Sequence, residues 1–418
     1  MARIYADDFD SRKNSAVNRR GFVIGTGATV LSINLMKSGT ALGSSANTKV
    51  KLGLIGSGGR GTWISRLFTQ HGGYEIVAAA DYFSDRVEAY GERYEVPAAN
   101  RFSGMAAHEK LLEKDVDAVA IETPPYFHPR QAEDAVDAGV HVYLAKPIAV
   151  DVPGCKTIEK CGKKAAEKKL CFLVDFQTRA DEFYKEALRR VHDGNLGRLA
   201  FGESTYHAGC PWKDQFKYLK DNPNNPENRL RAWGLDKVLS GDIITEQNIH
   251  TLDVASWIMD QEPLRAWGTC ARKVREDMGN CHDCFTVTFE YPNNVGIAFS
   301  SRQFEGYGSP GGINNRMFGS TGVLETQYGG QVIIRGQNPY DGGNTKTIFS
   351  HGAANNIAAF HENILNGNYE NSTVEPSVRS NLVTILGRTA AYTGEVVGWD
   401  EMLKKNERLD ANLEGLKG

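Results

Sequence analysis

The sequence predicts an α/β protein. A doubly wound parallel sheet of the Rossmann type comes first, and a C-terminal α/β domain with an open, mostly antiparallel sheet follows. A glycine-rich turn, "GLIGSGGRG" at residues 53–61, lies between an apolar run and a helical pattern. Apolar runs and helical patterns then alternate up to about residue 175. Beyond that point, period-two alternation dominates, joined by turn sequences such as "YPNN" and "GSTG".

Length and charge limit the classes of function. The chain has 418 residues and a formal net charge of -3, and this length fits two domains. A net charge so close to zero provides no broad basic surface for nucleic acid or anionic lipid. The seven cysteines are odd in number and irregularly spaced, so we expect no disulfide framework. Cys281 and Cys284 lack the second pair of ligands that a zinc site needs, and we predict no metal site.

Residues 1–47 have the composition of an export signal. Arg19 and Arg20 precede an apolar run at residues 22–36, and small residues follow it. The run is too short and too rich in glycine, serine and threonine to span a membrane, so we expect no membrane attachment of the mature form. The paired arginines resemble a twin-arginine signal. We therefore expect the twin-arginine export machinery as a partner and a periplasmic protein; a disordered tail with a chance arginine pair is the alternative.

Residues 48–175 are predicted to form an NAD(P)-binding domain. A short apolar run ending in glycine predicts a buried strand, and a helical pattern follows the glycines. In a GxGxxG turn, the first glycine permits the tight turn, the second lets the backbone approach the pyrophosphate, and the third lets the helix pack on the strand. The predicted cofactor-binding residues of this turn are Gly56, Gly58, Gly59, Arg60 and Gly61.

A second predicted strand ends at Asp81, twenty residues after Gly61. An acidic side chain at this spacing can accept hydrogen bonds from the ribose hydroxyls and would repel a 2′-phosphate. We therefore predict NAD as the cofactor, with NADP as the alternative. The other possible role of Asp81 is to cap the helix that follows.

The later predicted strands of residues 48–175 are followed by the short sequences "TPP", "KP" and "FQTR", which contain polar side chains. Ligands of parallel α/β sheets gather at the carboxyl ends of the strands. The side chains at or just beyond these ends are therefore candidates for the site: Thr123, Pro124, His128, Lys146, Gln177 and Arg179.

Residues 176–418 are predicted to form the substrate and oligomerisation domain. Within them Glu246, His250 and Asp253 are spaced four and three residues apart, so on one continuous helix they would share a face. A carboxylate placed in this way can orient the imidazole and fix its tautomer. Such a histidine can take a hydroxyl proton while hydride leaves the same carbon. A polar helix face without chemistry is the alternative, and no third ligand for a metal is in view.

The motifs in this order resemble the Gfo/Idh/MocA family, which includes glucose–fructose oxidoreductase and inositol dehydrogenase. The resemblance covers about residues 48–400 and rests on "GLIGSGGRG", "DAVAIETPPYFHPRQAEDAVDAGVHVYLAKP", "DGNLGRL", "SGDIITEQNIHTLDVASWIM" and "FGSTGVLE". It implies a Rossmann domain followed by an open-sheet domain that often builds dimers or tetramers. It also implies oxidation of a sugar or polyol hydroxyl with NAD or NADP.

The resemblance also implies roles for single residues. Lys146 corresponds to the lysine of the family's Glu-Lys-Pro motif, beside the nicotinamide and the reacting hydroxyl. Glu246 and His250 correspond to the family's Asp-x3-His pair, with the histidine as acid/base, and His128 matches a histidine of the cofactor-side wall. Ala145 and Glu246 depart from the usual glutamate and aspartate. The predicted catalytic residues are Lys146, Glu246 and His250, and the predicted substrate contacts are Lys146, Arg179, Tyr206, Trp233 and His250.

Three functions fit these motifs. The first is a sugar, glycoside or polyol dehydrogenase whose bound cofactor a second sugar recycles. The second is an NAD-dependent glycosidase that works by transient C3 oxidation and elimination. The third, a non-catalytic sugar-binding protein, conflicts with the intact glycine turn and with Lys146 and His250. The glycosidase needs one more acid/base group, for which the sequence offers Tyr126, Tyr206, His207 and Asp242 without selecting one.

Overall fold

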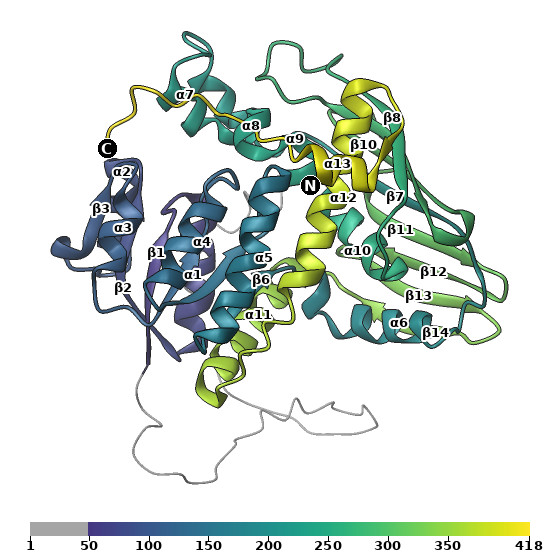
Figure 1. Ribbon diagram of the computed structural model, residues 1–418, viewed down its shortest axis with the longest axis horizontal. Coiled ribbons are helices and arrows are strands. Elements are labelled where there is room, and N and C mark those ends of the chain that lie inside the picture. Colours follow the sequence, from purple (N-terminus) through teal and green to yellow (C-terminus); the bar gives the residue numbers. More distant parts are fainter. Residues whose placement is uncertain (1–48) are drawn as a thin grey trace, which may run out of the picture. The chain divides into compact units, whose positions relative to one another are not determined.

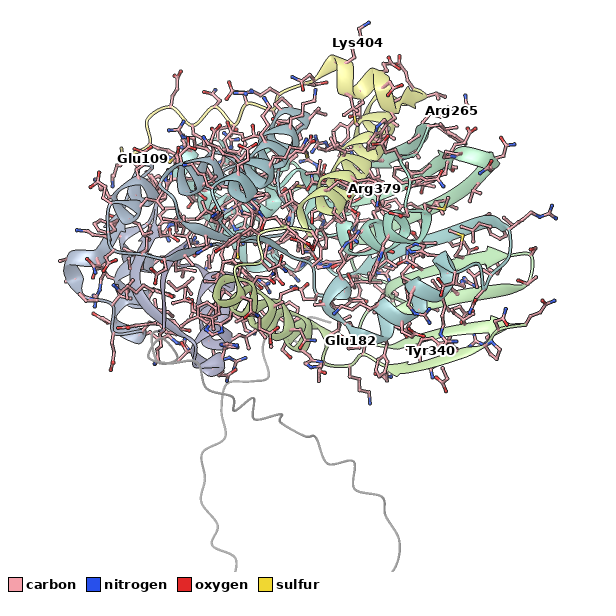
Figure 2. The ribbon with its side chains drawn as sticks, turned by 60° about the horizontal axis from the view of Figure 1, so that its bottom comes forward. Glu109, Glu182, Arg265, Tyr340, Arg379 and Lys404 are labelled. Atoms are coloured by element: carbon pink, nitrogen blue, oxygen red, sulfur yellow. The ribbon has the colours of Figure 1, made fainter. Side chains whose placement is uncertain are left out.

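The computed structural model describes residues 49–418, which form a six-stranded and a nine-stranded sheet with their helices (Figure 1). The predicted export signal, with Arg19 and Arg20, lies outside the described residues. Many charged side chains point outward, as Figure 2 shows for Glu109, Arg265 and Lys404. In the described part of the chain, no helix has the length and apolar character needed to cross a membrane. The predicted α/β class, with a Rossmann sheet followed by a mostly antiparallel sheet, is confirmed.

The first sheet is parallel, with strand order β3-β2-β1-β4-β5-β6. The order reverses between β1 and β4, and such a switch point is where doubly wound sheets bind their ligands. The strands are β1 (Val50–Ile55), β2 (Tyr74–Asp81), β3 (Arg101–Ser103), β4 (Ala118–Ile121), β5 (His141–Ala145) and β6 (Phe172–Asp175). The residues of β4, β5 and β6 are mostly apolar and buried, because helices cover both faces of the sheet.

Two apolar cores lie on the two faces of this sheet. On one face Ile64, Phe68 and Ile357 meet in one core, and on the other face Leu111, Ala132 and Ile158 belong to a second. An aspartate begins one of the helices, because the side chain of Asp151 accepts a hydrogen bond from Gly154 N. The helices are α1 (Gly59–His71), α2 (Ser84–Arg93), α3 (Ala107–Leu112), α4 (His128–Asp137), α5 (Val152–Glu167) and α11 (Ile348–Asn366).

The second sheet has the order β14-β13-β12-β11-β7-β10-β9-β8-β15, and only the central β7–β10 pair is parallel. Helices α6 (Glu182–His192), α10 (Ile249–Met259) and α12 (Val374–Thr393) pack on its inner face. Alternate residues of the strands are buried there, as the period-two pattern requires. The strands are β7 (Leu199–Ala208), β8 (Arg265–Ala271), β9 (Cys284–Tyr291), β10 (Val295–Gln303), β11 (Gly312–Gly319), β12 (Gly322–Gln327), β13 (Gln331–Gly336), β14 (Tyr340–Asn344) and β15 (Val397–Gly398).

The last helices of the chain return to the first sheet. Helix α11 packs against α1, and Tyr74 Oη donates a hydrogen bond to Ile357 O at 2.9 Å. The side chain of Asn371 accepts a hydrogen bond from Phe172 N at 2.7 Å. Packing therefore crosses the predicted boundary between residues 175 and 176, and the division into 48–175 and 176–418 stays a prediction.

Short helices lie between β7 and β8, and α13 (Trp399–Lys405) precedes the end of the chain. The short helices are the 3-10 turns η4 (Lys213–Tyr218) and η5 (Trp233–Leu235) and the α-helices α7 (Pro226–Arg231), α8 (Lys237–Ser240) and α9 (Asp242–Glu246). In Figure 1 the residues after α13 run past α9, α8 and α7 to the rim of the first sheet near α2.

Candidate functional site

The GxGxxG turn fits closely at the end of β1. Gly56 has φ of 102°, and a Cβ there would lie 2.7 Å from the carbonyl carbon of Glu122. A Cβ on Gly61 would lie 1.9 Å from the Gly56 oxygen. At Gly58 the nearest atom to such a Cβ is 3.6 Å away, and at Gly59 nothing lies within 4 Å. The backbone at the start of α1 is thus both close to the strand and open in front, which fits the approach of a pyrophosphate.

Asp81 ties the end of β2 to this turn. Its Oδ2 accepts a hydrogen bond from Ser57 N at 2.8 Å, and its Oδ1 accepts one from Phe83 N at 2.9 Å. The carboxylate therefore lies beside the glycine turn, where the ribose of a bound dinucleotide would lie. It contacts the start of α2 only through the N–H of Phe83, so capping of that helix is at most a part of its role.

The side chain of Arg60 lies across the carboxyl ends of the first sheet. Its Nε lies 3.2 Å from Glu122 Oε2, and its Nη2 lies 2.5 Å from Asp175 Oδ2. The guanidinium also lies over the ring of Trp63, 4.5 Å from its centroid. Arg60 thus bridges the carboxyl ends of β4 and β6, and its predicted contact with the cofactor stays a prediction.

His128 joins two loops of the site. Its side chain is almost fully buried. Its Nδ1 lies 2.8 Å from Pro147 O and its Nε2 lies 2.8 Å from Thr123 O. Burial lowers the pKa of His128 to about 4. The imidazole therefore fixes the Thr123–Pro124 loop against the loop of Lys146. His128 is buried, and its contacts position these two loops.

Lys146 follows β5 and reaches across to α9. Its Nζ donates hydrogen bonds to Glu246 O at 2.7 Å and to Glu246 Oε1 at 3.2 Å. The ammonium has three N–H donors, so one remains for another acceptor. Gln247 Nε2 donates to Glu246 Oε2 at 2.5 Å, and Tyr206 donates to Gln247 Oε1 at 2.5 Å. The lysine, the glutamate and the tyrosine thus belong to one polar network.

The predicted continuous helix through Glu246 and His250 is wrong. Helix α9 ends at Glu246 and α10 begins at Ile249, with two residues in between. The Glu246 carboxylate consequently contacts Lys146 and Gln247 and does not orient the imidazole. No glycine or proline marks this break, so the spacing alone could not reveal it.

The spacing placed Asp253 on one helix face with His250, but the partner of its carboxylate is Arg179. Arg179 Nε lies 3.0 Å from its Oδ1 and 3.1 Å from its Oδ2, and the guanidinium lies over Trp257 at 5.0 Å from the ring centroid. Arg179 comes from the 3-10 turn η3 (Thr178–Ala180) after β6. This ion pair attaches α10, one turn beyond His250, to the end of the first sheet.

The imidazole of His250 is neutral. Burial, and next the nearby ammonium of Lys146, hold the pKa of His250 well below its usual range. Its Nδ1 is buried and has no hydrogen-bond partner within residues 49–418, and its ring lies 5.3 Å from that of Tyr328. A neutral, positioned imidazole next to an ammonium can accept a proton from a hydroxyl.

The structure brings together only some of the predicted substrate contacts. Lys146 and Tyr206 are linked through Glu246 and Gln247, and His250 lies near Lys146. Trp233 lies elsewhere, in an apolar cluster with its ring 5.6 Å from that of Trp212. Its contact with a substrate stays a prediction without support from its neighbours.

Residues 209–240 and 406–418 form a structure that we call the cap. Met105 N donates to Lys417 O at 3.0 Å, Lys417 N donates to Tyr82 Oη at 3.2 Å, and the Arg231 guanidinium lies 3.9 Å from the ring centroid of Phe83. Because Tyr82 and Phe83 directly follow Asp81, the cap covers the end of the site predicted to hold the adenosine. Its apolar cluster consists of Tyr82, Phe83, Tyr126, Phe127, Leu230, Trp233, Val238, Leu239, Ala411, Leu413 and Leu416.

The cysteine pair and one polar cluster lie outside this site. All seven cysteines are free, and Cys281 and Cys284 each contact a backbone carbonyl rather than each other. His108, Glu109 and Asp134 bring possible ligand atoms within 4.8 Å of one another on α3 and α4. His108 and Asp134 already form an ion pair at 3.0 Å.

Two family models match this chain, one over the first sheet and one over part of the second. Residues 50–176 match the oxidoreductase family with an NAD-binding Rossmann fold, and residues 184–325 match the GFO/IDH/MocA C-terminal domain. An inositol 2-dehydrogenase of Rhizobium meliloti is 25% identical over 241 residues, which are 57% of this chain and 64% of that protein. A glycosyl hydrolase family 109 protein of Phocaeicola vulgatus is 30% identical over 179 residues, which are 41% of this chain and 32% of that protein.

The fold as a whole also has a solved counterpart. The crystal structure of the aldose-aldose oxidoreductase from Caulobacter crescentus superposes with a TM-score of 0.66 at 19% identity, covering 84% of this chain and 99% of that one. The matched stretches span less than two thirds of the two relatives above. With both of its domains matched and its glycine turn intact, this chain belongs to the GFO/IDH/MocA family, and its N-terminal half is an NAD-binding Rossmann domain.

Proposed function

We propose that this protein oxidises a hydroxyl group of a sugar, glycoside or polyol by hydride transfer to a retained NAD, with NADP as the alternative cofactor. One observation carries the proposal. Lys146 from the first sheet meets Glu246 from the second half of the chain at the rim of β4, β5 and β6, and the neutral imidazole of His250 lies near the same ammonium. An ammonium donor and an imidazole acceptor beside a nicotinamide can together promote the oxidation of an alcohol.

The nicotinamide, when bound, supplies the hydride acceptor. The chain's own residues act on the hydroxyl group. The remaining N–H of Lys146 donates to the substrate oxygen and stabilises the negative charge that develops there. His250 accepts the hydroxyl proton. Glu246 holds the ammonium with two acceptors and so fixes its direction, while His128 fixes the loop on which Lys146 lies.

The cap supports retention of the cofactor. It covers the residues after Asp81 with an apolar cluster and with backbone hydrogen bonds from Lys417. Entry or exit of the adenosine end requires these contacts to open, and their loss slows exchange. Purified protein should therefore contain dinucleotide, which is released on denaturation and identified by mass spectrometry.

We also propose that the protein is exported to the periplasm, which is consistent with a cofactor that stays bound. Arg19 and Arg20 mark a twin-arginine signal, and a folded protein with its dinucleotide bound would reach the periplasm ready to work. Fractionation of cells that express the full chain tests this. A double variant Arg19→Lys, Arg20→Lys should stay in the cytoplasm, and a cytoplasmic location of the unaltered chain would contradict the proposal.

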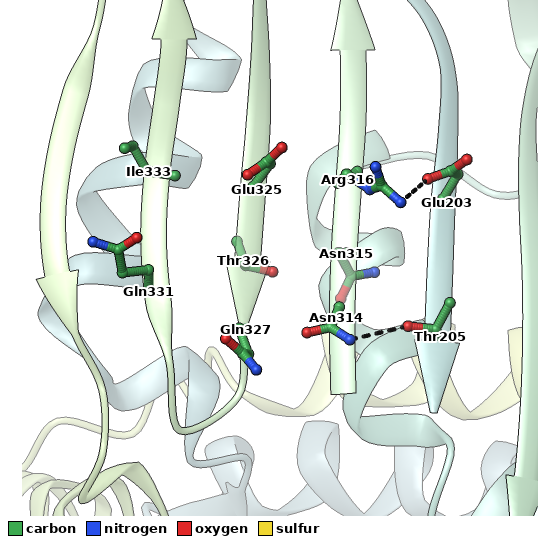
Figure 3. Close-up of a pocket in the computed structure, with 10 residues that line it drawn as sticks. All are labelled: Glu203, Thr205, Asn314, Asn315, Arg316, Glu325, Thr326, Gln327, Gln331 and Ile333. Carbon is green, nitrogen blue, oxygen red and sulfur yellow. Dashed lines mark hydrogen bonds and ion pairs between the residues drawn. The ribbon is translucent and has the colours of Figure 1, made fainter. Parts of the chain in front are cut away.

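The outer face of the second sheet supports a homo-oligomer, either a dimer or a tetramer. Phe201 is 45% exposed and stacks on Phe318 with ring centroids 4.5 Å apart, and Trp267 is 39% exposed. A polar pocket lies on the same face, on the side away from α10, and includes the pairs Arg316–Glu203 and Asn314–Thr205 (Figure 3). Light scattering tests the oligomer, and Phe201→Arg should dissociate it.

An NAD-dependent glycosidase is the second candidate. It is favoured by the glycosyl hydrolase family 109 relative and by Tyr206, which the hydrogen bonds through Gln247 link to Glu246 and Lys146. The other three acid/base candidates lie elsewhere. Asp242 is fully buried on Tyr392 and backbone N–H groups, His207 contacts Ser300, and Tyr126 Oη accepts Ala411 N of the cap.

One experiment separates the two candidates. Purified protein is incubated with para-nitrophenyl glycosides and, separately, with free sugars, without added NAD. Reduction of the bound cofactor without cleavage supports the dehydrogenase, and release of nitrophenol supports the glycosidase. If a panel of sugars, glycosides and polyols gives neither, the proposed function is wrong.

A further inference from the structure

Glu122 is a buried carboxylate at the switch point of the first sheet. It follows β4 directly, and its backbone N donates to Ile55 O of β1 at 2.8 Å. Its side chain has no exposed surface, and its Oε1 has no hydrogen-bond partner within residues 49–418. A buried carboxylate oxygen without a partner is costly, and a fold that keeps one calls for a functional explanation.

The charges around Glu122 do not balance. Its Oε2 and the carboxylate of Asp175 share a single guanidinium, that of Arg60. The nearby ammonium of Lys146 does not make up the difference, because it is paired with Glu246. Among residues 49–418, these two carboxylates and one guanidinium leave one excess negative charge at the ends of β4 and β6.

The excess charge lies on the side of the sheet where the nicotinamide half of a dinucleotide belongs. The pyrophosphate meets the start of α1 after β1, and the adenosine lies over β2 at Asp81. The other half must then extend across the switch point toward β4 and β5, where Glu122 and Lys146 lie. The oxidised nicotinamide ring carries a positive charge, and the reduced ring carries none.

We propose that the Glu122 carboxylate is the counter-charge of the oxidised nicotinamide, ionised beside the charged ring and protonated once hydride transfer has removed that charge. This inference rests on the proposed function. The balance closes: the substrate carbon gives a hydride to the ring, and the hydroxyl gives its proton to His250, which releases it to solvent. Glu122 then takes up one proton from solvent. Glu122 thereby favours NAD⁺ over NADH in the site and acts as a positioning residue, since it does not touch the substrate.

The pKa of Glu122 lies where the carboxyl group can change between its ionised and protonated forms near neutral pH. Burial raises the pKa of Glu122 to about 7, with Asp175 raising it further and with Arg60 and Lys146 opposing the shift. The hydroxyl of Tyr143, from β5, also faces this group of charges. Because the pKa is raised, the ionised form dominates only above neutral pH. A neighbouring positive ring would extend the ionised range to lower pH.

Competition between the two redox forms of the cofactor tests the inference. The holoprotein is equilibrated with an equimolar mixture of NAD⁺ and NADH, separated by gel filtration, and its bound dinucleotides are quantified after denaturation. At pH 8 Glu122→Gln should move the bound ratio about tenfold toward NADH. From pH 8 to pH 6 the unaltered protein should drift toward the ratio of the variant, whose own ratio stays constant.

Asp85→Asn is the matched control. It removes a carboxylate that pairs with Arg231 at the adenosine end, where NAD⁺ and NADH are identical. It should leave the bound ratio unchanged, whatever its effect on total binding. If Glu122→Gln weakens both forms equally, or if the unaltered protein shows no pH drift, the inference is wrong while the proposed function stands. If the unaltered protein binds neither form, both fail. The pH series needs no variant, so misfolding of Glu122→Gln would not remove the test.

Discussion

The two ends of the predicted dinucleotide site differ in the kind of side chain that forms them. At the rim of β4, β5 and β6, charged side chains are buried next to one another, and Arg60, Glu122 and Lys146 come from three separate segments. At the rim of β2 and β3, the cap contributes apolar and aromatic side chains from sequence-distant segments. The first end has electrostatics suited to a reaction, and the second has the burial suited to holding a ligand. Variants at the two ends should therefore separate turnover from retention.

The largest effect is expected at the turn that both ends share. Gly61→Ala would place a Cβ 1.9 Å from Gly56 O, so strand and helix must separate, and the free energy of unfolding should fall by about 3 kcal/mol. Gly59→Ala, with open space around its Cβ, should stay within about 1 kcal/mol of the unaltered protein. Chemical denaturation of both variants measures this. Equal stability of the two would show that the turn is less tightly packed than described.

At the reactive end, Lys146→Ala and His250→Ala should each lower turnover about a hundredfold. No hydrogen bond joins the Lys146 or His250 side chain to the cap, so the release rate of the dinucleotide should change less in these variants than when the cap is shortened. Lys163→Ala and His351→Ala, at exposed positions of α5 and α11, are the matched controls and should keep full turnover. Near-normal rates in both active-site variants would remove these residues from the mechanism.

At the capped end, deletion of residues 407–418 should accelerate loss of bound dinucleotide about tenfold. Turnover with excess NAD should change less than twofold, because Lys146 and His250 remain in place. Leu416→Ser tests the same cluster with one substitution, and Leu365→Ser, on α11 and 62% exposed, is its control. Dialysis followed by absorbance measurement gives the release rate. Unchanged release in the deletion variant would contradict a retaining role of the cap.

The part of the site that depends on local geometry could be predicted from the sequence. The turn at Gly56 and Gly61, the strand end at Asp81 and the parallel sheet follow from neighbouring residues, and the structure agrees with them. The short edge strand β3 was not predicted. Lys146 and His250 were predicted from spaced motifs, and the structure places them near each other. Their roles stay predictions.

Features that depend on distant contacts could not be predicted. The partner of Glu246 is Lys146, a hundred residues away, and not His250, four residues away. Glu122 looks like an ordinary polar residue after a strand, and only tertiary packing shows that its carboxylate is buried. The cap was missed as well. Leu409, Leu413 and Leu416 are spaced four and three residues apart, as on one face of a helix, but no helix forms there. Leu413 and Leu416 pack instead against distant segments of the chain, which the spacing does not reveal.

The indole of Trp63 offers a built-in optical signal. It lies against the Arg60 guanidinium, which bridges the ends of β4 and β6. Its emission overlaps the absorption band of a reduced nicotinamide, so energy transfer between them would report the redox state of the bound cofactor in real time. A stopped-flow instrument could then follow a single turnover without any added dye.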